Sequence, residues 1–159
     1  MTDMLVKLYT LPALQPVLDD QARKGITVRR GLAPEKSFVL EWVRRHFSEF
    51  WVNECDVAYN SRPVTCWVAV EDGRLIGFGC YDTTAKGFFG PTGVGEAARG
   101  RGTGTALLLA CLHDMRAQGY GYAIIGSAGP TDYYAKVVGA IPIPDSKPGI
   151  YGGMLRTSE

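Results

Sequence analysis

The spacing of apolar residues divides the chain into a series of short elements. Alternation or short apolar runs predict strands over residues 26–30, 64–70, 75–81, 88–94 and 122–126. Spacing near 3.6 residues predicts a helix that begins at Pro34 with one apolar face from Phe38 to Phe50, and further helices over 48–59, 105–118 and 130–138. Asp72-Gly73 between two of the strands is a strong hairpin signal. This order of elements predicts an α/β fold in which one mixed sheet carries helices on both faces.

The two ends of the chain are less regular. Met4 to Thr10 predicts a short strand, which could pair with a sheet edge or with a second subunit. Helical turns over 17–24 end at Gly25. Two extended runs, 140–143 and 150–155, follow the last helix. We interpret residues 1–159 as one domain, with 1–25 as an N-terminal extension of a core over 26–156.

A glycine-rich run joins the strand at 88–94 to the helix that follows it. Seven of the chain's 20 glycines lie between Gly87 and Gly104. The free N–H groups at a helix N-terminus form an anion site, and Arg99 and Arg101 add formal positive charge beside it. We therefore expect a pyrophosphate here. The chain contains neither the Gly-x4-Gly-Lys-Ser/Thr loop nor the Gly-x-Gly-x-x-Gly fingerprint, so other phosphate motifs must be considered.

Two motifs carry a resemblance to a known family. Arg99-x-x-Gly102-x-Gly104 resembles the Arg/Gln-x-x-Gly-x-Gly/Ala signature of the GCN5-related N-acetyltransferases (GNAT), which wraps the pyrophosphate of acetyl-coenzyme A (acetyl-CoA). Residues 133–140, Tyr-Tyr-Ala-Lys-Val-Val-Gly-Ala, resemble the family's Phe-Tyr-x-Lys-x-Gly-Phe stretch with one extra residue before the glycine. The resemblance covers roughly residues 26–156 and implies the GNAT fold.

The resemblance also implies an activity and a set of roles. The activity is direct transfer of an acetyl group from acetyl-CoA to a primary amine of a small molecule or peptide. Tyr134 would be the general acid at the departing thiolate, whereas Tyr133 is better explained by packing. Pro91 lacks an N–H group and fits a bulge in the strand before the loop. The implied coenzyme-binding residues are Thr92, Gly93, Val94, Arg99, Gly100, Arg101, Gly102, Thr103, Gly104, Thr105, Ile125, Gly126 and Ser127.

The base that accepts the proton of the amine is not evident from the sequence. The strand before the loop has no titratable side chain between Gly87 and Gly95. Tyr81 and Asp82, at the end of the preceding strand, are candidate general bases, and Glu49 and Asp56 are further ones. The helices after the first core strand should build the acceptor pocket, with Trp42, Trp51 and Tyr59 as possible wall residues.

Composition narrows the function classes. The chain is 46% hydrophobic with a net charge of +1, so no bulk field selects nucleic acid or a membrane surface. Four cysteines without a Cys-x-x-Cys spacing and two histidines give no metal-site pattern. Free thiols and the lack of a signal-peptide pattern favour the cytoplasm. The expected partners are acetyl-CoA and an amine, and dimers in the resembled family make a homodimer possible.

Two other functions remain open at this point. A cysteine nucleophile, Cys80 or Cys111, could act with a histidine in a different enzyme class. The chain could also be a non-catalytic acyl-CoA-binding sensor or scaffold. The missing strand carboxylate gives the sensor some weight, while the intact loop and Tyr134 favour catalysis.

Overall fold

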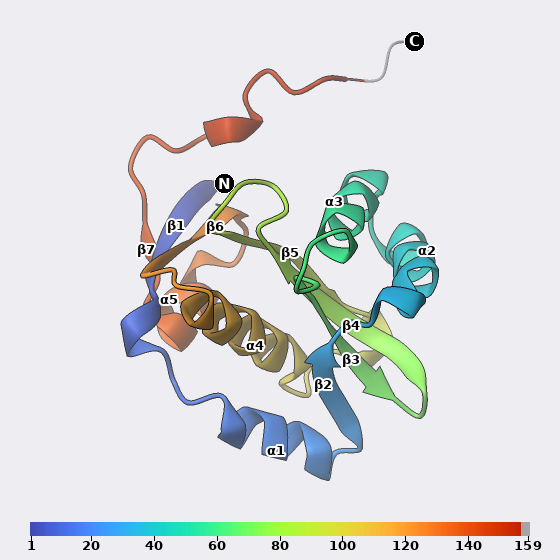
Figure 1. Cartoon of the computed structure of the whole chain (residues 1–159). Helices are drawn as coiled ribbons and strands as arrows, with labels where there is room; N and C mark the ends of the chain where they lie inside the picture. Colours follow the sequence, from blue (N-terminus) through green and yellow to red (C-terminus); the bar gives the residue numbers. More distant parts are fainter. Residues whose placement is uncertain (157–159) are drawn as a thin grey trace.

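The computed structural model describes residues 1–156 and contains one seven-stranded sheet with helices on both faces (Figure 1). The strands are β1 (Thr2–Lys7), β2 (Ile26–Arg30), β3 (Cys66–Glu71), β4 (Arg74–Tyr81), β5 (Phe88–Val94), β6 (Tyr122–Ala128) and β7 (Ile141–Pro142). The helices are α1 (Gln15–Arg23), α2 (Lys36–His46), α3 (Glu49–Tyr59), α4 (Thr103–Ala117) and α5 (Thr131–Val138). The predicted mixed sheet is confirmed. Within residues 1–156, no helix is long and apolar enough to cross a membrane.

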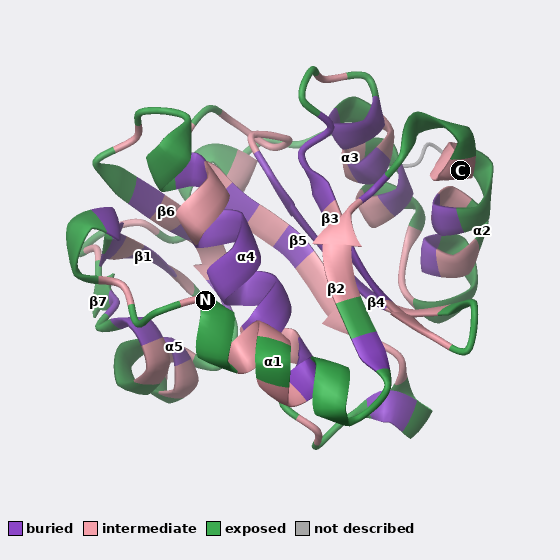
Figure 2. Cartoon of the chain, turned by 60° about the horizontal axis from the view of Figure 1, so that its bottom comes forward, coloured by how far each residue is buried: buried purple, intermediate pink, exposed green. Residues whose placement is uncertain are grey.

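Helix α4 is the centre of the fold. It lies between the sheet and α1, and most of its residues are buried (Figure 2). Gly77 and Gly79 of β4 allow this close packing, because a Cβ atom at Gly77 would lie 3.1 Å from Cδ1 of Leu107. Helices α2 and α3 cover the other face with a separate cluster of buried residues that includes Val43, Val52 and Phe78.

Strand β1 lies inside the sheet. The sheet order is β2-β3-β4-β5-β6-β1-β7, and Leu5 pairs antiparallel with both Ile124 of β6 and Ile141 of β7. Met4 and Val6 are fully buried against the α4 face. The first strand is therefore part of the sheet itself, and not an addition to its edge as the sequence suggested.

The structure confirms the second helix predicted over 48–59, but it breaks the single apolar face predicted from Phe38 to Phe50. Helix α2 ends at His46, and Ser48 begins α3 by accepting the N–H of Trp51 with its side-chain oxygen. The predicted apolar face is thus broken, and Phe38 and Phe50 are 75% and 62% exposed. A serine that caps a new helix outweighed the apolar periodicity.

The predicted extended run over 150–155 is wrong. Residues Gly149–Tyr151 form a 3-10 turn, and no strand follows within the described residues. Residues 143–156, called the C-terminal tail below, instead leave β7 and pass beyond the end of the sheet that carries the N-terminus (Figure 1).

Strands β5 and β6 separate in the middle of the sheet. They pair in parallel only at Phe88 with Ile124 and at Phe89 with Ile125. Strand β5 continues along β4, where one extra residue is accommodated between Phe89 and Thr92. The bulge that Pro91 predicted is therefore confirmed. Beyond it, one edge of β5 faces a gap and not a neighbouring strand.

Candidate active site

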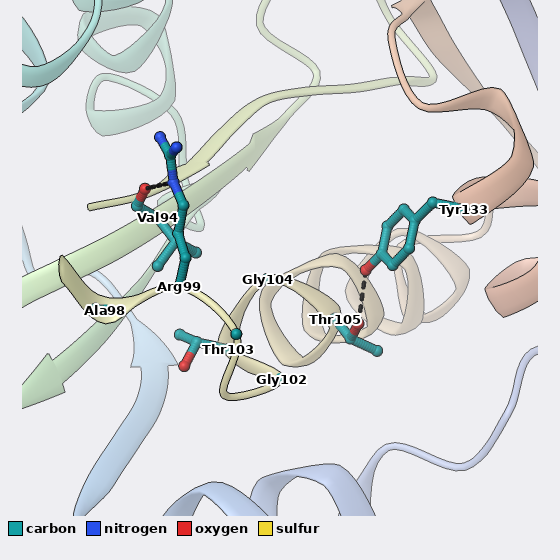
Figure 3. A pocket seen from close by; sticks show the side chains of 9 residues that line it. Val94, Ala98, Arg99, Gly102, Thr103, Gly104, Thr105 and Tyr133 are labelled. Carbon is teal, nitrogen blue, oxygen red and sulfur yellow. Dashed lines mark hydrogen bonds between the residues drawn. The ribbon is translucent and has the colours of Figure 1, made fainter. Parts of the chain in front are cut away.

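The glycine-rich loop between β5 and α4 leaves backbone N–H groups free beside a cavity. Gly102 has a left-handed backbone (φ +82°), which favours glycine, and it precedes the first turn of α4. Among residues 1–156, no acceptor takes the backbone N–H groups of residues 100–105. The loop opens on a cavity of about 250 Å³ (Figure 3). Its lining consists of Val94, Ala98, Arg99, Gly100, Gly102, Thr103, Gly104, Thr105 and Tyr133. Free N–H groups at a helix N-terminus suit a phosphate ligand.

The two arginines of the loop have different surroundings. Arg99 lines the cavity, and its Nε donates a hydrogen bond to the Val94 carbonyl oxygen at 3.1 Å. Arg101 forms a bidentate ion pair with Glu71 at 2.7 and 2.9 Å and does not line the cavity. Arg101 was expected to add positive charge beside the anion, and the Glu71 carboxylate of β3 offsets that charge.

Gln21 of α1 holds the loop from behind, a contact that sequence reasoning missed. Its side chain is 1% exposed. Its Nε2 donates to the Arg101 carbonyl oxygen at 2.8 Å, and its Oε1 accepts from the Thr103 hydroxyl at 2.7 Å. Lys24 donates to the same carbonyl oxygen at 2.9 Å. A signal was present, since Gln21 stands four residues after Val17 on the inward side of α1.

A second cavity, of about 1060 Å³, lies where β5 and β6 separate. Of the sequence-predicted residues, Thr92, Ile125, Gly126, Ser127 and Tyr134 line it, whereas Gly93 lines neither cavity. A Cβ atom at Gly93 would lie 2.3 Å from the Phe47 ring, so this glycine makes room for an aromatic side chain. The backbone N–H of Ser127 donates to Asp3 at 2.7 Å and is thereby occupied.

Tyr133 and Tyr134 face different cavities. Tyr134 is 8% exposed, and burial raises the pKa of its hydroxyl to about 12. None of the hydrogen bonds among residues 1–156 involves that hydroxyl, which leaves it free for a ligand in the larger cavity. The Tyr133 hydroxyl instead hydrogen-bonds the Thr105 side chain at 2.6 Å beside the glycine loop (Figure 3). The packing role expected of Tyr133 therefore overlooked its place at the anion site.

Neither predicted general base is placed to act as one. The Tyr81 hydroxyl is buried in the core and donates to Asp114 at 2.5 Å, and burial raises its pKa. Asp82 accepts from the Gly87 N–H and the Tyr120 hydroxyl, both at 2.7 Å. Asp82 thus fixes the loop after β4, and neither side chain lines the larger cavity. Both candidates are wrong because structural hydrogen bonds occupy them away from the site.

Glu54 of α3 is the carboxylate that sequence reasoning missed. It lines the larger cavity together with Trp51, one helical turn earlier. Burial raises the pKa of its carboxyl, which also accepts a hydrogen bond from the Thr84 hydroxyl. The two weighed acids, Glu49 and Asp56, instead pair with Arg44 and Lys36. The useful signal was the spacing of Glu54 from Trp51 on one helical face.

The remaining candidates are structural. Trp42 stacks on His46, and Tyr59 is buried; neither lines the larger cavity. Cys80 and Cys111 are fully buried, and burial raises the pKa of both thiols. The histidines hydrogen-bond carbonyl oxygens, His46 that of Trp42 and His113 that of Pro12. These contacts contradict the cysteine-nucleophile alternative, because within residues 1–156 neither thiol lines either of the two cavities or hydrogen-bonds a histidine.

Comparisons with known proteins point to one family. The model of the acetyltransferase (GNAT) family matches residues 34–139. No curated protein matches the chain significantly.

Several solved structures share the fold. One is a GCN5-related glucosamine N-acetyltransferase region of a fungal multi-domain GH3 β-N-acetylglucosaminidase, with 15% identity and a TM-score of 0.73 over 89% of this chain and 19% of that one. A GCN5-related N-acetyltransferase from Sphaerobacter thermophilus has 23% identity and a TM-score of 0.70 over 89% of this chain and 48% of that one. A GNAT family acetyltransferase from Brucella melitensis, solved with acetyl-CoA, has 20% identity and a TM-score of 0.55 over 70% of this chain and 80% of that one. The chain thus spans less than half of the first two structures.

Proposed function

Since the chain belongs to the acetyltransferase (GNAT) family, we propose that it transfers an acetyl group from acetyl-CoA to a primary amine. One observation carries this proposal. The two cavities lie along β5, one at the glycine loop and one at the gap beside β6, and the second places a free tyrosine hydroxyl and a half-buried carboxylate in one space. Along β5, the glycine loop would bind the phosphates of an acyl-CoA, the gap beside β6 would hold its pantetheine arm, and the tyrosine and carboxylate would act at its thioester.

The chain's own groups suggest how the coenzyme binds. The N–H groups of residues 100–105 and the Arg99 side chain would hold the pyrophosphate. The pantetheine arm would then lie in the gap along the free edge of β5, which brings the thioester beside Thr92 and Tyr134. Backbone N–H groups at the β5 bulge would stabilise the oxyanion of the tetrahedral intermediate.

In the proposed reaction, Glu54 is the general base for the amine and Tyr134 is the general acid for the departing thiolate. The neutral amine attacks the acetyl carbon, a C–N bond forms, and Glu54 takes the proton that the nitrogen loses. The C–S bond then breaks, and Tyr134 hydrogen-bonds the departing sulfur and passes it a proton, which it regains from solvent. A phenol with a pKa of about 12 stays protonated before this step. Because a thiol has a pKa near 8.5, most of the tyrosine's effect should come from the hydrogen bond.

Thiol release in the presence of acetyl-CoA and a panel of amines tests the proposal. Tyr134→Phe should lower kcat by roughly 100-fold, the scale of a lost general acid, while it leaves the dissociation constant of acetyl-CoA within about twofold. Tyr9→Phe, which changes an exposed tyrosine, is the matched control. An equal loss of binding and turnover in Tyr134→Phe would assign that residue to packing.

The position of Glu54 weakens the alternative that the chain is a non-catalytic acyl-CoA sensor or scaffold. That alternative drew its weight from the lack of a carboxylate on β5, and Glu54 supplies a carboxylate to the same cavity from α3. Acetyl-CoA binding without turnover of any amine would favour the sensor or scaffold.

A further inference from the structure

We infer that the acceptor is a monoamine with a compact apolar body, which binds between α3 and the C-terminal tail with its amino group at Glu54. This inference rests on the proposed function and specifies the substrate class for the same site. It goes beyond the two sequence motifs, because both of them concern the coenzyme and neither describes the acceptor.

Apolar side chains from two separate elements face the larger cavity. Helix α3 contributes Phe50 and Trp51, and the tail contributes Ile150, Met154 and Leu155. Four of these are large hydrophobic residues with high exposure, from 49% at Met154 to 93% at Leu155. Exposed apolar residues that gather around one cavity indicate a surface that an apolar ligand covers. The body of the acceptor would fill the space between these two walls.

The charged residues that line the larger cavity indicate how many amino groups the acceptor carries. Within residues 1–156, Glu54 is the one acidic side chain that lines this cavity, and Arg156 at the outer part of the tail is the one basic side chain. A single carboxylate can balance one ammonium group as the acceptor binds, and that group then loses a proton to solvent before it attacks as the neutral amine. A second positive charge on the acceptor would meet no carboxylate in the cavity and would face Arg156. The lining therefore disfavours polyamines.

The tail is held in place against the site. A Cβ atom at Gly126 would lie 2.7 Å from the Tyr151 hydroxyl, so the tyrosine rests directly on the bare backbone of β6. At the start of the same turn, a Cβ atom at Gly149 would lie 3.2 Å from Asp3 Oδ2. Tyr151 also neighbours Thr84, whose hydroxyl donates to Glu54. The tail thus forms a wall beside the carboxylate and limits the length of the acceptor.

Amine selectivity of the full chain tests this inference. With saturating acetyl-CoA, thiol release gives kcat/KM for 2-phenylethylamine, isoamylamine, spermidine and a short lysine peptide. We expect both apolar monoamines to exceed spermidine and the peptide by at least about tenfold, the effect of one uncompensated charge worth about 1.4 kcal/mol. Ile150→Ala should raise KM for 2-phenylethylamine several-fold and leave the acetyl-CoA affinity unchanged. The control is Ile141→Ala, an exposed isoleucine of β7 outside the cavity, which should change neither value.

The outcomes separate this inference from the proposed function. If acetyl-CoA binds and spermidine or the peptide is acetylated as well as the monoamines, the inference is wrong and the proposed function stands. If acetyl-CoA binds but calorimetry detects no binding of 2-phenylethylamine or isoamylamine to the CoA-loaded protein, and neither is acetylated, the inference is also wrong. If acetyl-CoA itself does not bind, the proposed function fails and the inference fails with it.

Discussion

Replacement of Gln21 by leucine should weaken both the fold and coenzyme binding, although Gln21 lines neither cavity. The substitution removes the 2.8 Å bond to the Arg101 carbonyl oxygen and the 2.7 Å bond from the Thr103 hydroxyl. Lys24 still donates to the carbonyl oxygen, but Thr103 is 2% exposed and loses its acceptor. One lost hydrogen bond and one unsatisfied buried hydroxyl together cost about 2–3 kcal/mol of the free energy of unfolding. The protein should remain folded, since domains commonly have ~5–15 kcal/mol.

A double-mutant cycle identifies the contact. Thr103→Val alone should also lower the free energy of unfolding, because it leaves the side-chain oxygen Oε1 of Gln21 without a donor. The double variant Gln21→Leu/Thr103→Val should lose about 1–2 kcal/mol less than the sum of the single variants, since both partners are then apolar. Denaturant unfolding followed by tryptophan fluorescence measures all four proteins. Gln15→Leu is the control on the same helix, because Gln15 is exposed and bonds only Asp19 among residues 1–156.

Calorimetric titration with CoA gives the functional half of this prediction. Loss of the clamp should let the loop depart from the arrangement that aligns its N–H groups, and affinity should fall about tenfold, or about 1.4 kcal/mol. Single-variant losses that add to within about 0.5 kcal/mol, together with an unchanged CoA affinity in Gln21→Leu, would refute the reasoning.

Three further changes test other parts of the site. Gly104→Val should weaken CoA binding without loss of stability, because a Cβ atom there has an ordinary 3.7 Å contact with Val94 while the added methyl groups enter the cavity at the loop. Gly102→Ala should instead lower the free energy of unfolding by about 1–2 kcal/mol, because residue 102 has a positive φ. Equal thermal stabilities of the two variants would contradict these expectations. Glu54→Gln should lower kcat/KM about 100-fold and remove the acidic limb from the pH profile of kcat/KM. Burial raises the pKa of Glu54, so the activity of the unmodified protein should rise with pH above the ordinary glutamate range. A pH profile that the substitution leaves unchanged would exclude Glu54 as the base. Asp114→Asn should lower the free energy of unfolding by about 3 kcal/mol, because Arg30 and Tyr81 lose the carboxylate that they share. Denaturant unfolding measures this loss, and a value below about 1 kcal/mol would contradict the expectation.

Local patterns predicted the strands and helices of the interior well. The strand at 26–30 has the predicted bounds, and so does the strand at 88–94 with its bulge at Pro91. In the first segment alternating apolar and polar residues specify a strand, and in the second a proline restricts the backbone. The second helix over 48–59 was predicted, but the apolar face was wrongly extended to Phe50, because a window of apolar spacing does not register the single capping bond of Ser48.

The position of β1 could not be predicted from local patterns. A short strand such as Thr2–Lys7 fits many sheet edges, and its partners in β6 and β7 are more than a hundred residues away. The extended run predicted over 150–155 was wrong because its first residues belong to a 3-10 turn.

For the candidate site, the motifs identified the glycine loop and Tyr134, but neither the carboxylate in the larger cavity nor the side chain that holds the loop. The glycine loop follows from its glycines, since few other residues adopt the φ of Gly102. Glu54 and Gln21 reach the site from helices far away in sequence, and only tertiary packing tells them from the surface acids Glu49 and Asp56. Tyr81 and Asp82 were chosen for their closeness in sequence to β5, and the core and a loop hydrogen bond use them instead.

Calorimetric titration of the full chain with acetyl-CoA, with CoA and ATP as comparisons, tests the central claim most directly. The loop, the gap beside β5 and Tyr134 predict one-to-one binding of acetyl-CoA and CoA at roughly micromolar concentrations, and no comparable binding of ATP. Absence of acetyl-CoA binding, or equal binding of ATP, would contradict the assignment of the two cavities to an acyl-CoA.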